Sequence, residues 1–115
     1  MRVAIIGSRN LQDQEEYWYN KICESIPKNC TEIVSGGAEG IDTLARRYAT
    51  EYELIFKEFL PEYNKYGKSA PLMRNMQIIE YANIALVFWD GESRGTAQVI
   101  KICCEIDKPL EIFFV

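Results

Sequence analysis

Three segments of this sequence carry small and polar residues of the kind that hold an anion. They are residues 7–10, the glycine turn over residues 35–42, and residues 90–96. Each follows a predicted strand, and the last two lead into predicted helices. Glycine lets backbone N–H groups come close to a ligand, and a helix N-terminus favours negative charge. The pattern therefore predicts a site for a phosphate-bearing small molecule.

The residues expected to contact this ligand lie in these segments or in a predicted helix over residues 72–81. In that helix Arg74 offers a guanidinium to phosphate or carboxylate. The plain structural alternative is that the glycines only make turns, the Ser, Thr and Asp residues only cap helices, and Arg74 is a solvated charge. The predicted set is Gly7, Ser8, Arg9, Ser35, Gly36, Gly37, Ala38, Glu39, Gly40, Asp42, Arg74, Asn75, Asp90, Ser93, Gly95 and Thr96.

Several classes of chemistry are excluded or disfavoured by what the sequence lacks. There is no histidine, so no Ser-His-Asp triad or Cys-His pair can form. The four cysteines lack the Cys-x-x-Cys spacing of a zinc site, and no metal is predicted. Neither the G-x-G-x-x-G fingerprint nor the P-loop pattern is present, which disfavours a standard NAD-binding domain and a P-loop NTPase. The carboxyl candidates for acid–base work in the three segments are Glu39, Asp42, Asp90 and Glu92.

Apolar periodicity predicts the elements that position these segments. Strands are expected over residues 2–7, 31–35, 53–60, 84–89 and 110–115, with helices between them and a polar loop over 61–68. A capping box of Asp13 and Glu16 is expected to open the first helix. The alternation predicts one α/β domain over residues 1–115. It is a Rossmann-like three-layer sandwich whose parallel sheet has the order 3-2-1-4-5, with ligands at the switch point.

Composition places further limits on function. The chain has 115 residues, 48% of them apolar, and a net charge of −4 with a pI near 4.9. This acidic balance argues against nucleic acid or an anionic membrane as a partner. No apolar run reaches the ~20 residues that span a bilayer, so a cytoplasmic location is expected. Aromatic residues 17–19 are a candidate dimer contact. Tyr63, Tyr66 and Trp89 are candidates to stack on a base, with Tyr66 favoured because it lies in the polar loop and Trp89 ends a buried strand.

Several of these strings together resemble the SLOG superfamily. They are residues 7–9, residues 35–42, the pair Arg74-Asn75 and the pair Gly95-Thr96. That superfamily joins the DNA-processing protein DprA (Smf) and the cytokinin-activating Lonely Guy proteins. The chain looks most like its small YspA-type, YpsA-related branch, over nearly its whole length. The resemblance implies a Rossmann-like fold, binding of nucleotides or nucleotide derivatives, and a dimer.

One departure from the Lonely Guy pattern bears on catalysis. Lonely Guy enzymes hydrolyse the bond between a base and ribose 5′-monophosphate, and their pattern P-G-G-x-G-T-x-E places a catalytic glutamate two residues after the threonine. Here Gln98 stands at that position, and no proline precedes the glycines. An amide cannot serve as a general base or stabilise an oxocarbenium ion by charge. The family's arginine is matched by Arg74, so the resemblance implies a kept pocket without the hydrolytic carboxylate.

Three functions remain open from the sequence. The favoured hypothesis is a binding or sensor domain for a nucleotide or a nucleotide-derived, phosphate-bearing small molecule. This nucleotide-like molecule is the expected ligand, and the sequence identifies no certain cofactor. The second is a hydrolase that cleaves an N-glycosidic or phosphoester bond in the same pocket. The third is a DprA-like single-stranded nucleic-acid binder that forms a charged groove by oligomerisation. The strings SGGAEGID and Arg74-Asn75 favour the third, whereas the low pI and the lack of an added DNA-binding module argue against it.

Overall fold

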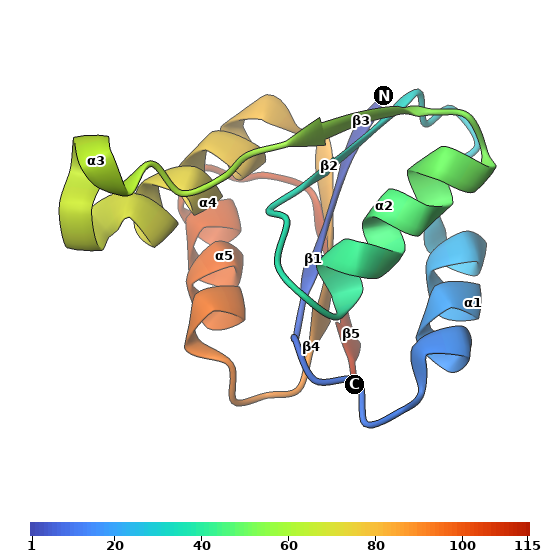
Figure 1. Ribbon diagram of the computed structural model, residues 1–115. Helices are drawn as coiled ribbons and strands as arrows, with labels where there is room; N and C mark the ends of the chain where they lie inside the picture. Colours follow the sequence, from blue (N-terminus) through green and yellow to red (C-terminus); the bar gives the residue numbers. More distant parts are fainter.

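The computed structural model describes residues 1–115 and shows a five-stranded sheet with helices on both faces (Figure 1). Strands and helices alternate along the chain, apart from two short helices that follow the third strand. The elements are β1 (Arg2–Gly7), α1 (Glu15–Ser25), β2 (Glu32–Ser35), α2 (Ile41–Glu51), β3 (Ile55–Glu58), α3 (Tyr63–Tyr66), the 3₁₀ helix η1 (Gly67–Ser69), α4 (Ala70–Tyr81), β4 (Ile84–Trp89), α5 (Arg94–Glu105) and β5 (Leu110–Phe114).

All neighbouring strands pair in parallel, and the sheet has the order β3-β2-β1-β4-β5. The predicted Rossmann-like fold and strand order are therefore confirmed. The register places Val3 of the central strand between Ile33 of β2 and Ile84 of β4. Because the chain crosses to the other half of the sheet after β3, β1 and β4 form the switch point. The loops that follow them meet at one edge of the sheet.

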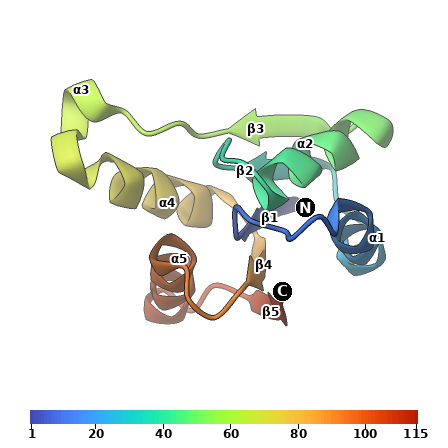
Figure 2. The same cartoon turned by 60° about the horizontal axis from the view of Figure 1, so that its bottom comes forward.

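Alternate side chains of β1 fill two separate cores. Val3 and Ile5 pack with α1 and α2, whereas Ala4 and Ile6 pack with α4 and α5 on the other face (Figure 2). This division follows from the two-residue period of a strand. Fully burying an aliphatic side chain stabilises the fold by about 1.5–3 kcal/mol. The two cores therefore hold the carboxyl ends of the central strands in place beneath the loops.

The start of the first helix differs from the sequence-based prediction. The helix begins at Glu15, and its N-cap, Gln14, makes no side-chain capping bond. The Gln14 N–H donates to the carbonyl of buried Leu11 (3.0 Å), which forms a tight turn. This turn leaves Asp13 outside the helix at a φ of 58°. The predicted capping box of Asp13 and Glu16 is therefore wrong.

The third strand and the segment after it also differ from the prediction. β3 forms an edge of the sheet and is shorter than the predicted strand over 53–60. The predicted polar loop over 61–68 instead contains α3 and η1. We call residues Tyr63–Ser69, which form these two elements, the arm. Both views show the arm standing away from the sheet at the N-terminal end of α4 (Figures 1 and 2).

The aromatic residues of α1 do not form an exposed cluster. Trp18 and Tyr19 are buried inside the protein, and only Tyr17 is exposed. The predicted dimer contact at residues 17–19 therefore has no apolar surface beyond Tyr17, although the dimer itself stays a prediction. None of the helices combines the length and the apolar composition needed to cross a bilayer.

Candidate functional site

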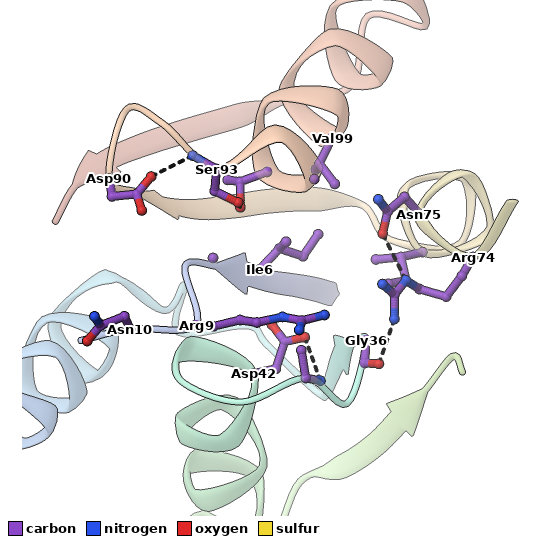
Figure 3. A pocket seen from close by; sticks show the side chains of 15 residues that line it. Ile6, Arg9, Asn10, Gly36, Asp42, Arg74, Asn75, Asp90, Ser93 and Val99 are labelled. Carbon is purple, nitrogen blue, oxygen red and sulfur yellow. Dashed lines mark hydrogen bonds between the residues drawn. The ribbon is translucent and has the colours of Figure 1, made fainter. Parts of the chain in front are cut away.

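A cavity of about 290 Å³ lies at the carboxyl edge of the sheet, where the switch point was predicted (Figure 3). Its walls come from the end of β1 and the loop after it, the glycine turn, one face of α4, and the start of α5. Residues far apart in the sequence thus meet around one hollow. The lining residues are Ile6, Gly7, Arg9, Asn10, Gly36, Ala38, Asp42, Arg74, Asn75, Ile78, Asp90, Ser93, Gly95, Thr96 and Val99.

The N-terminus of α5 forms one wall of the cavity. The N–H groups of Arg94, Gly95 and Thr96 have no hydrogen-bond acceptor within the protein, because a helix leaves its first amides unpaired. The hydroxyls of Ser93 and Thr96 lie 3.3 Å apart beside them. A helix of twelve residues adds a partial positive charge at this end. This wall can bind an anion such as phosphate.

The loop that leads into α5 is held by Asp90. One oxygen of its carboxylate accepts hydrogen bonds from the N–H groups of Glu92 and Ser93, both at 2.8 Å. These bonds stabilise the ionised form and lower the pKa of Asp90 below its usual value. Asp90 therefore shapes the loop as a fixed anion, which makes it a weak proton acceptor.

Arg74 on α4 forms part of another wall and is held by two neighbours. Its Nη1 donates to the Gly36 carbonyl (2.8 Å), and its Nε donates to Oδ1 of Asn75 (2.9 Å). The Asn75 amide in turn donates to Oε1 of Gln98 on α5 (3.0 Å). Burial lowers the pKa of Arg74, and the nearby Asp42 carboxylate opposes that change. The chain from Gln98 to Gly36 thus links α5, α4 and the glycine turn, and it fixes the guanidinium at the cavity. Figure 3 shows the part of this chain from Asn75 through Arg74 to Gly36.

Asp42, at the start of α2, is the one deeply buried carboxyl of the site. It is 6% exposed. Its Oδ2 accepts a hydrogen bond from the Ala38 N–H (3.1 Å), whereas its Oδ1 has no partner. Burial raises the pKa of Asp42, and the bond from Ala38 only partly offsets this effect. A buried oxygen without a partner costs stability when the group is charged.

The raised pKa of Asp42 gives a pH-dependent prediction for stability. Because the folded pKa exceeds the unfolded one, the native state binds more protons, and this contribution is lost as pH rises through the folded pKa. Asp42→Asn stays neutral at every pH. We therefore expect its free energy of unfolding, relative to that of the wild type, to be higher at about pH 7 than at about pH 4. Urea unfolding of both proteins at the two pH values measures this. An unchanged difference between them would contradict it.

The glycine turn plays a different part from the one predicted. A Cβ at Gly40 would lie 2.4 Å from the carbonyl oxygens of Ser8 and Arg9, and the Ile41 N–H donates to the Ser8 carbonyl (3.2 Å). A Cβ at Gly37 would lie 2.9 Å from side-chain atoms of Glu58 and Leu60 instead. The small residues at these two positions therefore allow the turn to pack on the protein itself. Close packing against the loop after β1 and against β3 thus accounts for glycine at Gly40 and Gly37.

Eleven of the predicted ligand-binding residues line the cavity, and five do not. Ser8 and Ser35 are buried, and their hydroxyls bond to the backbone at Asp90 and Ile5. Glu39 is exposed outside the cavity, and Gly37 and Gly40 also lie off its lining. The prediction missed the lining residues Ile6, Asn10, Ile78 and Val99. The helical period could have found Ile78, four residues after Arg74, and Val99, three residues after Thr96.

The four candidate catalytic carboxyls are not brought together for hydrolysis. Glu39 and Glu92 are exposed and do not line the cavity. Asp90 lines it with a lowered pKa, and Asp42 lines it with a raised one. At the position of the Lonely Guy glutamate, Gln98 is engaged as an acceptor for Asn75. No group of three or more Cys, Asp or Glu side chains is placed to hold a metal ion.

Two arginines, Arg9 and Arg74, line the cavity together with two carboxyls, Asp42 and Asp90. The ion pairs of the structure involve Arg46, Arg47 and Lys101, none of which lines the cavity. Arg9 and Arg74 make no ion pair. Arg9 extends across the cavity toward the glycine turn (Figure 3). An unpaired guanidinium is free to bind a carboxylate or a phosphate oxygen.

Comparisons with known proteins find two similarities to DNA-processing proteins. A sequence model described as DNA recombination-mediator protein A matches residues 1–55. A search of curated proteins finds no match. The structure resembles DNA processing protein A from Helicobacter pylori, described as having a single-stranded DNA binding mode, with a TM-score of 0.75 and 22% sequence identity. The match covers 97% of this chain and 64% of that one, so the chain spans less than two thirds of that protein's length.

These comparisons correct two predictions. They favour single-stranded nucleic-acid binding over the small-molecule nucleotide sensor, and they contradict the argument against nucleic acid as a partner. The physical reason is that net charge averages over the whole surface, whereas the cavity has unpaired arginines of its own. The YspA-type branch stays a prediction. The chain is similar to DprA in sequence over residues 1–55 and in fold over nearly its whole length. These two similarities confirm the resemblance to the SLOG superfamily.

Proposed function

We propose that this protein binds single-stranded nucleic acid at the carboxyl edge of its sheet, with the sugar–phosphate backbone entering the cavity. The observation that carries the proposal is that one cavity combines the two unpaired guanidiniums of Arg9 and Arg74 with the unpaired amides of α5. The fold around it matches that of a protein described as binding single-stranded DNA. The nucleotide-like ligand expected from the sequence then corresponds to the nucleotide units of a strand.

The distribution of charge supports a polyanionic partner. Three of the segments that build the cavity, residues 1–12, 63–79 and 93–104, contain no Asp or Glu, and the two carboxyls that line it, Asp42 and Asp90, come from the glycine turn and the loop after β4. The three segments carry Arg9, Arg74 and Arg94, and the net charge of −4 arises from the rest of the chain. Phosphate neutralisation by such cations supplies most of the affinity in non-specific binding of nucleic acids. Local charge, rather than the pI, is therefore what a strand meets at this edge.

The shape of the site favours single strands over a duplex. The cavity holds about 290 Å³ between helix ends and loops. A nucleotide can enter a hollow enclosed in this way only when it is not stacked and paired within a double helix. Phosphate groups would bind the α5 amides and the Ser93 and Thr96 hydroxyls, with Arg9 and Arg74 as the countercharges. The predicted dimer and the cytoplasmic location remain predictions beside this proposal.

The proposal is tested by titrating the protein into a fluorescently labelled oligothymidylate and following anisotropy at low salt. We expect saturable binding of the strand and weaker binding of a duplex of the same length. A failure to bind at protein concentrations on the order of 100 μM would contradict it, since even non-specific sites bind in that range. Competition by unlabelled strand, and weaker competition by the same concentration of unlabelled duplex, provides the control.

A further inference from the structure

The arm, residues Tyr63–Ser69, is an ordered segment that the core does not explain. None of its residues is buried, and neither of its helices has a side-chain cap. Gly67, at a φ of 56°, lets the chain reverse between the two short helices. Both cartoon views show the arm projecting beyond the sheet, next to the N-terminal end of α4 (Figures 1 and 2).

The exposed side chains of the arm are of two kinds, aromatic and cationic. Tyr63 is 60% exposed. Lys65 and Lys68 are exposed and make no ion pair, and no carboxylate occurs from residue 63 to residue 79. Aromatic rings beside unpaired cations are what single-stranded nucleic acids bind, through base stacking and phosphate neutralisation.

The arm is continuous with the cavity. It leads directly into α4, and Arg74 follows Ser69 by five residues, which is about 7.5 Å along a helix axis. Tyr63 also lies close enough to Arg74 to influence the pKa of its guanidinium. A strand that leaves the cavity past Arg74 therefore meets the arm next.

We propose that the arm is a second contact for the bound strand, in which the Tyr63 ring stacks on a base while Lys65 and Lys68 neutralise phosphates. The inference rests on the proposed function and extends the path of the strand beyond the cavity. Tyr66, the aromatic expected from the sequence to stack, is half-buried, and the Lys65 Nζ lies 5.1 Å from its ring centroid. Tyr63 is therefore the ring that is open to a base.

The test compares Tyr63→Ala with Tyr17→Ala. Tyr17 is also 60% exposed but lies on α1 and does not line the cavity, which makes it a matched control. Binding is measured with an oligonucleotide that contains 2-aminopurine, whose fluorescence is quenched when it stacks. We expect Tyr63→Ala to weaken binding by about 5- to 150-fold and to reduce the quenching, as for the loss of one base–aromatic stack. Tyr63→Phe, which keeps the ring, is expected to bind like the wild type.

A second measurement separates stacking from charge. The double variant Lys65→Gln/Lys68→Gln is expected to make the negative slope of log K against log salt shallower by about 1.4, at ~0.7 per phosphate of a single strand. Tyr63→Ala is expected to leave that slope unchanged. Binding by Tyr63→Ala within twofold of Tyr17→Ala would overturn the inference, while loss of binding in Arg74→Ala would keep the proposed function. If the wild type itself does not bind, both fail.

Discussion

Arg74→Ala is expected to weaken binding of a single-stranded oligonucleotide by roughly 10- to 150-fold, which corresponds to the ~1.5–3 kcal/mol of a hydrogen bond to a charged group. Its guanidinium is already oriented by Gly36 and Asn75, so little side-chain entropy is lost when a phosphate binds. Fluorescence anisotropy with wild type and variant in the same buffer measures the ratio of the two dissociation constants.

Two further variants make this result specific. Arg46→Ala removes an exposed arginine of α2 that pairs with Glu58, and it is expected to bind like the wild type. Arg74→Lys keeps the charge but loses the planar fork, so it is expected to recover only part of the affinity. Equal affinity in Arg74→Ala and the wild type, with both proteins folded by thermal melting, would show that Arg74 does not contact the strand.

Gly40→Val is expected to lower the free energy of unfolding by about 3 kcal/mol or more. A Cβ there would lie 2.4 Å from two backbone carbonyl oxygens, and overpacking alone costs about 1–3 kcal/mol. The backbone also adopts a φ of 74° and a ψ of −121°, which a β-branched residue cannot adopt without strain of about 1–3 kcal/mol. Urea unfolding measures the difference.

Gly95→Ala is the matched control for this effect on stability. A Cβ at Gly95 meets nothing within 4 Å, and the residue lies in the first turn of α5. Replacing glycine by alanine at a position of compatible backbone stabilises a protein by ~0.4–1 kcal/mol through the unfolded state. If Gly40→Val were as stable as Gly95→Ala, the glycine turn would not be packed against the loop after β1.

The fold could be predicted from the sequence because its signals are local and repeated. Apolar runs such as residues 84–89, separated by helical periods, require a parallel sheet with helices on both faces. The order of the strands then follows from right-handed crossovers. Asp13 shows where local rules fail, because a capping pattern has no effect once burial of Leu11 bends the chain. The arm was missed for a similar reason, as its two short helices bury no side chain that would create a period.

The site could be predicted in outline but not in its detailed roles. Arg74 and the first turn of α5 both line the cavity, and both lie in helices that the apolar period of the sequence predicts. Nothing in the sequence shows that Gly40 faces two carbonyl oxygens, because that contact joins loops about thirty residues apart. Likewise, Asp42 has an unpartnered oxygen only because of how α2 packs. Net charge misled the choice of partner, because charge density at the cavity depends on which segments the fold brings together.

The salt dependence of strand binding by the unmodified protein tests the central claim most directly. The claim is that Arg9 and Arg74 neutralise phosphates at the carboxyl edge of the sheet. Between about 50 mM and about 200 mM salt, the slope of log K against log salt is expected to be −1.4 or steeper, at about 0.7 for each of two phosphates. A flat response, or no binding at the lowest salt, would contradict the claim.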